Sequence, residues 1–344
     1  MKSMKKLMLA GLVLLASVMV LVGCKMEAEP EVKVPKVYEF TTEPQILTNY
    51  ESPNGTGDEY IYMAFGDWPQ TIKASGVTVD ESKSKQMGIF TYYLGSDGNY
   101  YVEHKSEYYK VEPIVWRVLN SKDKEYDELE APLLLAENIL IGGIPYYSVN
   151  NVKRTIGGVE IFTNNYEHSQ IRAFLNGLSY EYKESDSAEQ IKKDEYKDAG
   201  FLQTAFTEIA GNFIASITVD NSAQSTSDAT GILAQDTNNA CKNTKDKIFL
   251  LSEQEATMLD YGFDVYNASG QGNTRIRVTT NYAEATGVSQ SSTENYGGWW
   301  WLRSPLSFSE TVARGIRDDG FASDGNLVLN AYGGVVPALS ISLQ

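Results

Sequence analysis

Apolar and polar residues alternate in several short stretches of the first half of the chain. The pattern begins near Tyr60, where YIYMAFG alternates as a strand does, and residues 91–104 (TYYLGSDGNYYVEH) predict two strands joined by a Gly/Asp turn. Apolar runs over Pro113–Leu119 and Ala131–Leu140 predict two more strands, both buried. This half of the chain therefore predicts a sheet of short strands.

The period then changes from two residues to about 3.6. Apolar side chains recur at i, i+3, i+4 and i+7 over residues 169–178 and, more loosely, over residues 201–213, which predicts two helices packed on the strands. The apolar positions are Ile171, Phe174, Leu175 and Leu178 in the first segment and Leu202, Phe206, Ile209 and Phe213 in the second. Residues 247–256 (KIFLLSEQEA) predict a buried strand that runs into a third helix, with Ser252 and Glu255 as a capping box.

Only short strands are predicted after that helix. They cover WWWLR, VARGIR, NLVLN and VPALSI, separated by Asp-Gly, Asp-Gly-Asn and Gly-Gly turns. The polar residues 217–246 predict a long loop, and no spacing within them matches a calcium-binding loop. Strands, then helices, then short antiparallel strands favour an α+β domain over alternating βαβ units, and no proline-rich break after residue 58 divides it.

The first residues have the pattern of an export signal. Three lysines precede an apolar run from Leu7 to Val22, and Leu21-Val22-Gly23-Cys24 resembles a lipobox, which is cleaved before a cysteine that is then lipidated. A transmembrane helix is the alternative, and the run is short for one. We expect residues 1–23 to be a lipoprotein signal peptide, Cys24 to be the lipid anchor, residues 24–57 to be a flexible tether and residues 58–344 to be the folded domain.

The negative net charge of the chain limits the classes of molecule that it can bind. Removing residues 1–23 takes away three lysines and no acids, so the formal charge moves from −16 to −19. Nucleic acid is not an expected partner, because binding phosphate needs a basic surface. The membrane is expected to be reached through the lipid on Cys24, and the protein to be exported, anchored to the bacterial envelope at the outer membrane and exposed on the cell surface.

Few residues suit catalysis or metal binding. His104 and His168 are the only histidines, and Cys241 is the only cysteine besides Cys24, so we interpret these residues as surface or bystander groups and expect no cofactor and no metal. Asp318 and Asp319 are adjacent acids, but RDDG has the composition of a tight turn, which explains them better than a pair of catalytic carboxylates does.

Three consecutive tryptophans are the most unusual feature of the chain. In a strand, Trp300 and Leu302 share one face, and Trp299, Trp301 and Arg303 share the other. One face can be core. The other can be covered by a loop, or its rings can stack against a ligand.

Six motifs in order resemble a known family. They are FGDWPQ (Phe65–Gln70), PIVWRVL (Pro113–Leu119), IRAFLN (Ile171–Asn176), DKIFLLSEQEA (Asp246–Ala256), WWLRSP (Trp300–Pro305) and GVVPAL (Gly334–Leu339). Together they are similar to the formylglycine-generating-enzyme type of C-type lectin fold. The lipobox and the terminal frame resemble the treponemal variable lipoproteins whose C-terminal segment is diversified by a retroelement.

This resemblance implies a C-type lectin-like fold of short antiparallel strands with two or more helices, and a segment diversified at about residues 299–339. Between Leu302 and Leu343 the chain has no Lys, Met, Gln or Trp and one Glu, as asparagine codons randomised at adenine would give; a short glycine-rich β segment could share this composition. The paired cysteines of the oxidase relatives are missing, and Val336 stands where the family commonly has Arg, so we expect no enzymatic activity.

By the same resemblance, the tryptophans and glycines of this segment form a rigid scaffold, which includes Trp299, Trp300, Trp301 and Arg303. The exposed side chains between the tryptophans and the glycines bind varying protein or glycan ligands. The expected ligand-binding residues are Leu306, Ser307, Phe308, Ser309, Arg314, Arg317, Asp318, Phe321, Ser323, Asp324, Leu327, Leu329, Asn330 and Tyr332. For the apolar members, burial in a small sheet is the alternative. Two other functions remain open: a lectin or carbohydrate-active enzyme that stacks sugars on Trp299 or Trp301, and a structural envelope lipoprotein.

Overall fold

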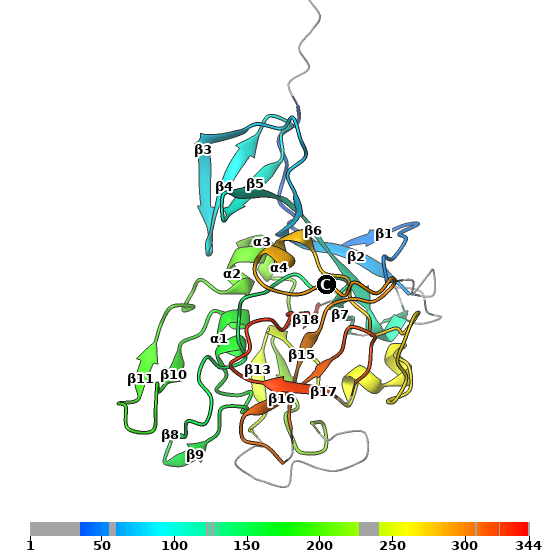
Figure 1. Cartoon of the computed structure of the whole chain (residues 1–344). Helices are drawn as coiled ribbons and strands as arrows, with labels where there is room; N and C mark the ends of the chain where they lie inside the picture. Colours follow the sequence, from blue (N-terminus) through cyan, green and yellow to red (C-terminus); the bar gives the residue numbers. More distant parts are fainter. Residues whose placement is uncertain are drawn as a thin grey trace, which may run out of the picture. The chain divides into compact units, whose positions relative to one another are not determined.

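The alternating stretches of the first half form most of one large antiparallel sheet. The computed structural model describes residues 35–54, 60–121, 124, 128–129, 131–226, 241–306, 308–322 and 324–342. Within these ranges the strand order is β14-β18-β7-β6-β5-β4-β3, and β2 pairs with both β6 and β1 (Figure 1). The strands are β1 (Gln45–Leu47), β2 (Tyr62–Ile72), β3 (Val79–Met87), β4 (Phe90–Gly95), β5 (Tyr100–His104), β6 (Glu107–Val118), β7 (Leu133–Ala136), β14 (Ile248–Phe249) and β18 (Ala338–Ser340). The predicted hairpin over residues 91–104 is confirmed as β4 and β5.

The two helices predicted from apolar spacing are present but shorter than that spacing suggested. The first is α1 (Gln170–Asn176), and the second is divided into α2 (Phe201–Ala205) and α3 (Glu208–Gly211). A further helix, α4 (Asn281–Ala285), was not predicted. Ser169 caps α1, and Gly177 ends it with φ +67°, so Leu178 lies beyond the helix and is exposed. Phe206 is extended between α2 and α3, so the second predicted face is broken, and Ile209 is 61% exposed where burial was expected.

The predicted capping box at residues 252–255 is confirmed, although the helix after it is not an α-helix. Glu255 N–H donates to Ser252 Oγ (3.1 Å) and Ser252 N–H donates to Glu255 Oε2 (2.9 Å). The turn that follows is a single 3-10 turn at Glu255–Thr257, because the helical conformation ends at the extended residue Met258.

Three small ladders lie outside the main sheet. They are β8 (Arg154–Ile156) with β9 (Val159–Ile161), β10 (Tyr180–Tyr182) with β11 (Ile191–Lys193), and β12 (Ile217–Val219) with β13 (Thr244–Asp246). The last pair closes the two ends of the segment that we predicted to be a loop, because Ile217 pairs with Asp246 and Val219 with Thr244. Residues 227–240 of that segment lie outside the described residues.

The C-terminal third forms a three-stranded antiparallel sheet of β15 (Trp300–Pro305), β16 (Val312–Ile316) and β17 (Asp324–Leu327). The predicted Asp-Gly turn is confirmed, since Gly320 has φ +83° between β16 and β17. The predicted Asp-Gly-Asn turn is wrong, because Asp324, Gly325 and Asn326 pair with Gly315, Arg314 and Ala313 of β16. Strand β17 therefore begins two residues before the predicted strand.

The N-terminal boundary of the domain also differs from the prediction. Residues 36–54 belong to the compact unit Lys36–Gln344 instead of forming a tether up to residue 57. Strand β1 pairs with β2, and Thr41 N–H donates to the buried Asp67 carboxylate (2.8 Å), which also accepts from the Tyr38 hydroxyl. Phe40 packs edge-on against Tyr92 with ring centroids 5.3 Å apart, so aromatic burial fixes this segment. Residues 1–34, including Cys24, lie outside the described residues.

The described chain is a mixed, sheet-rich α+β fold, as predicted. Its core gathers side chains from all parts of the chain, with Trp68, Trp116, Trp300 and Trp301 each at most 1% exposed. None of the helices in the described ranges has the length and apolar character that a membrane crossing requires.

Candidate functional site

Strand β15 supplies the buried frame of the predicted binding region. Every residue from Trp300 to Pro305 is buried, which a strand covered on both faces explains. The ring of Trp301 meets the ring of Trp299 edge-on at 4.5 Å, and Trp300 on the opposite face donates its indole N–H to the carbonyl of Arg275 (3.2 Å). Trp301 is therefore no stacking platform for a sugar, and Trp299 is half-buried with its indole N–H held by Asp324 (2.9 Å).

Two glycines make room for these rings. A Cβ at Gly315 would lie 2.1 Å from Cζ2 of Trp299, and one at Gly333 would lie 2.4 Å from Nε1 of Trp301. Any side chain at either position would push an indole away. The frame therefore depends on glycine at these positions as well as on tryptophan.

Arg303 joins the WWLRSP segment to the SEQEA segment. Its guanidinium is fully buried and pairs with both carboxylate oxygens of Glu255, through Nη1 and through Nη2 at 2.8 Å. Leu250 O (2.8 Å) and Asp220 O (3.1 Å) accept two further bonds from it. Burial by itself would lower the pKa of Arg303, but the Glu255 carboxylate raises it above its ordinary value. Arg303 is thus a charged structural link in the frame.

Arg314 was predicted to be an exposed binding residue, but it is buried. It is only 6% exposed, and its Nε lies 3.3 Å from Oε2 of the fully buried Glu253. Residues 312, 314 and 316 of β16 share one face by strand alternation, and this face is turned toward the protein. Arg314 therefore belongs to the buried frame.

The loop between β15 and β16 presents the most exposed apolar side chain of the region. Phe308 is 80% exposed, although the backbone on both sides of it is held. Asn164 Nδ2 donates to Ser309 O (2.7 Å) and to Val312 O at the start of β16 (3.0 Å), and Thr163 Oγ1 donates to Glu310 O (3.0 Å). A fixed backbone with a solvent-exposed aromatic ring is the geometry of a contact residue.

Two leucines lie at the same end of the sheet as Phe308. Leu306 is half-buried and donates its N–H to Val312 O (3.0 Å), while Leu327 pairs with Val312 from the other side and is 43% exposed. Leu306, Val312 and Leu327 therefore follow one another across the three strands, with Phe308 in the adjoining loop. We call Leu306, Phe308 and Leu327 the apolar end of the sheet.

The opposite end carries charged residues. Arg317 pairs with Asp319 through two hydrogen bonds (2.8 and 2.5 Å), and its guanidinium lies 4.9 Å from the centre of the Phe321 ring. Asp324 is occupied by the indole of Trp299, and Asp318 is half-buried. Strand β16 lies between this end and the apolar end, so the predicted residues do not gather on one open face.

The remaining predicted residues follow β17. Leu329 is exposed, Asn330 accepts the N–H of Tyr332 (2.8 Å), and Tyr332 is 70% exposed where the chain returns toward β15. Ser309 is half-buried and its hydroxyl accepts from Thr311 N–H (3.2 Å). Ser307 and Ser323 lie outside the described residues.

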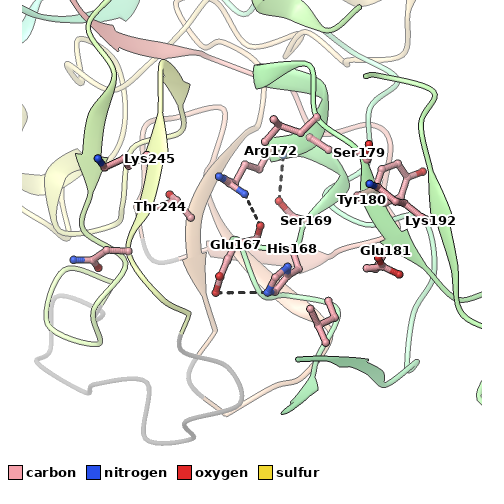
Figure 2. A pocket seen from close by; sticks show the side chains of 14 residues that line it. Glu167, His168, Ser169, Arg172, Ser179, Tyr180, Glu181, Lys192, Thr244 and Lys245 are labelled. Atoms are coloured by element: carbon pink, nitrogen blue, oxygen red, sulfur yellow. Dashed lines mark hydrogen bonds and ion pairs between the residues drawn. The ribbon is translucent and has the colours of Figure 1, made fainter. Parts of the chain in front are cut away.

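A cavity of about 440 Å³ lies elsewhere, beside the first turn of α1. Figure 2 shows Glu167, His168 and Arg172 between the β13 residues Thr244 and Lys245 on one side and the β10–β11 residues Tyr180, Glu181 and Lys192 on the other. A second cavity of about 490 Å³ adjoins it and shares Ile156, Glu167 and His168. No local sequence pattern predicts either cavity, because the walls come from segments up to 89 residues apart, from Ile156 to Lys245.

His168 is the titratable centre of this cavity. Burial lowers the pKa of its imidazole, and the nearby Arg154 and Arg172 lower it further, against an opposing effect of Glu167, whose Oε2 lies 3.6 Å from Nε2. Our interpretation of His168 as an ordinary surface residue was therefore incomplete. His104, at the end of β5, donates its Nε2–H to Ala285 O (3.2 Å). Burial raises the pKa of Cys241 to about 12. Within the described ranges no three His, Cys, Asp or Glu side chains converge as metal ligands would.

The chain belongs to the family described as Domain of unknown function (DUF6273), whose sequence model matches residues 131–343. The match covers the cavity beside α1 and the whole sheet of β15–β17. No curated protein and no solved structure matches the chain.

Proposed function

We propose that this protein is a lipid-anchored, surface-exposed binding protein without catalytic activity, which contacts protein or glycan ligands through side chains at the rim of the β15–β17 sheet. In this proposal Cys24 carries the lipid, residues 1–23 are removed on export to the outer membrane, and a retroelement diversifies the exposed positions. The domain adopts the C-type lectin-like fold of the formylglycine-generating-enzyme type.

One observation supports the proposal. In the β15–β17 region, buried side chains whose replacement would destabilise the fold are distinct from exposed side chains that can be replaced at little cost. Trp300, Trp301 and Arg303 are fully buried, whereas Phe308 in the adjoining loop is 80% exposed on a backbone held by Asn164. Replacing a buried side chain of this size typically costs several kcal/mol, whereas exposed positions away from special contacts tolerate change within about 0.5 kcal/mol. Variation at the rim is therefore compatible with a stable fold.

The corrected set of contact residues is smaller than the sequence suggested. It centres on the apolar end of the sheet, with Leu329 and Tyr332 as further exposed candidates. Exposed aromatic side chains of this kind supply contact area at interfaces with protein ligands. Arg314 and Asp324 drop out of the set, because each holds a partner inside the frame.

Sequencing of this locus in many isolates tests the proposal. Substitutions should concentrate between residues 302 and 333 at exposed positions such as 308, 327, 329 and 332. Arg303, Arg314 and Gly315 should stay constant within the same segment. Substitutions spread evenly over the chain, or frequent at the buried positions, would contradict diversification of a binding surface.

The anchor has a separate test. Cys24→Ser should move the protein from the membrane fraction to the soluble fraction, because a lipid chain contributes about 0.8 kcal/mol per buried methylene and the substituted chain has no acylation site. A Cys241→Ser variant is the matched control and should stay with the membrane. Retention of the Cys24→Ser protein would refute lipidation at this residue.

A further inference from the structure

The two adjoining cavities beside α1 differ in the character of their walls. The cavity of about 490 Å³ is lined by Ile156, Val159 and Ile161 of the β8–β9 hairpin, and we call it the apolar chamber. The cavity of about 440 Å³ lies between α1, β13 and the β10–β11 ladder (Figure 2). Glu167 and His168 line both cavities, so they lie where the two meet. Volumes of this size are typical of pockets that hold small molecules.

The apolar chamber offers hydrocarbon surface that the rest of the domain does not cover. Val159 is 52% exposed although it is apolar and lies in a strand. Burial raises the pKa of the Cys241 thiol to about 12, so the thiol is neutral at pH 7 and adds to the apolar wall. A hydrocarbon group of a ligand would therefore gain free energy by leaving water for this chamber.

The basic side chains around the two cavities contribute little positive charge to the inside. The guanidinium of Arg172 is neutralised by the buried carboxylate of Asp246, at 2.9 Å from Nε to Oδ1. On β13 the exposed Lys245 alternates with Asp246, so its side chain points away from the cavity. Lys192 and Lys242 are exposed as well, and exposed lysines keep their ammonium groups in water.

Glu167 supplies a negative charge at the junction of the two cavities. Its side chain is 23% exposed, and its Oε2 accepts the N–H of Lys242 (3.1 Å). Among the described residues no group donates to its Oε1. The His168 imidazole lies 3.6 Å from Oε2, but burial lowers its pKa, so it is neutral at pH 7 and does not compensate the carboxylate. A carboxylate beside an apolar wall complements an ammonium group on a hydrocarbon.

We propose that this site binds a primary amine with a hydrocarbon body, its ammonium at Oε1 of Glu167 and its hydrocarbon in the apolar chamber. The net charge of the chain, −16, attracts cations and repels anions. Glu181 in the wall of the second cavity adds charge of the same sign. The site does not rest on the proposed function of the β15–β17 sheet, because no described residue that lines the two cavities lies on those strands.

Calorimetric titration at pH 7 with hexylamine, hexanol and hexanoate tests the proposal. The three probes share one hydrocarbon chain and differ in charge. Hexylamine should bind about tenfold more tightly than hexanol, because its ammonium bonds to a carboxylate, and hexanoate should not bind. Equal binding of hexanol would overturn the role of Glu167, and tighter binding of hexanoate would overturn the sign of the charge. Absence of hexylamine binding at about 10 mM would overturn the whole proposal.

Variants of the two walls separate the charge from the apolar contact. Glu167→Gln keeps an oxygen for the Lys242 N–H, so hexylamine should bind about tenfold more weakly while hexanol binds unchanged. Val159→Thr replaces one methyl group by a hydroxyl and should weaken both ligands about threefold. Glu103→Gln on β5 is the matched control, because it removes the same charge from an exposed site elsewhere. An equal loss in Glu103→Gln would show that hexylamine responds to net charge alone, which would overturn the site.

Proton NMR of the two imidazoles locates the ligand. Hexylamine should shift the signals of His168, which lines both cavities, and leave those of His104 in place. A shift of His104 alone would overturn the location. Failure of hexylamine to bind would leave the proposed function of the β15–β17 sheet intact, and evenly spread sequence variation would leave the amine site intact.

Discussion

The buried pair of Arg303 and Glu255 gives the sharpest prediction about the frame. In Arg303→Met the hydrophobic stem is kept while the guanidinium and its bonds to Glu255, Leu250 and Asp220 are lost. Removing one partner of a buried ion pair typically costs about 3–5 kcal/mol. The Glu255 side chain is 22% exposed and keeps the N–H of Ser252, so we expect the lower end of this range, about 3 kcal/mol.

Equilibrium unfolding in guanidinium chloride, followed by the fluorescence of the five tryptophans, measures this loss. The midpoint should fall without a change in slope, and the melting temperature should drop by about 6 °C. Arg317→Met is the matched control. Its pair with Asp319 lies at the surface, where the arginine side chain is 47% exposed, so the free energy of unfolding should change by less than about 1 kcal/mol.

A double variant distinguishes two causes of the lost stability: loss of the ion-pair attraction, and burial of an unpaired Glu255 carboxylate. Adding Glu255→Leu to Arg303→Met removes the unpaired carboxylate, so the double variant should be more stable than Arg303→Met alone. Two results would refute the reasoning: equal losses in Arg303→Met and Arg317→Met, or a double variant less stable than Arg303→Met by the full cost of a second mutation.

Three further predictions concern other parts of the chain. Gly315→Ala should cost about 2 kcal/mol or more, because its Cβ displaces Trp299 from an aromatic contact and a charged hydrogen bond, whereas an alanine at the uncrowded Gly211 should be neutral in the same unfolding assay. Tyr38→Phe should cost about 1 kcal/mol, measured the same way, and no loss would mean that residues 36–54 do not stabilise the domain. Burial holds the pKa of His168 below its ordinary 6.5, so the unfolded chain binds the proton more tightly and stability should fall as the pH drops below 6.5; an unchanged profile in His168→Gln would exclude this residue as the cause.

Local sequence signals identified the elements that local interactions stabilise. The hairpin of β4 and β5, the capping box of Ser252 and Glu255 and the turn at Gly320 each depend on residues within about ten positions of one another. The α+β class followed from the order of these elements. Helix lengths were overestimated because the caps and breaks, such as Gly177 and the extended Phe206, do not alter the apolar spacing.

The features that sequence reasoning missed depend on distant residues. Residues 36–54 look polar and aperiodic, and only their contacts with β2 and with Tyr92 reveal that they belong to the domain. Strand alternation in β16 predicted which face carries Arg314. It could not show that this side chain pairs with Glu253, which is distant in the sequence. The cavity around His168 has no local pattern at all, since its walls meet only after folding.

The position of β18 has a consequence for how the protein is made. The strand is formed by the last residues of the chain, yet it lies between β14 and β7 in the interior of the main sheet. Until those residues leave the ribosome, the backbone N–H and C=O groups on one side of β7 have no strand to pair with. The main sheet therefore cannot be completed before then. A stop codon before residue 338 would remove β18, so β7 and β14 would lose the strand that joins them in the main sheet.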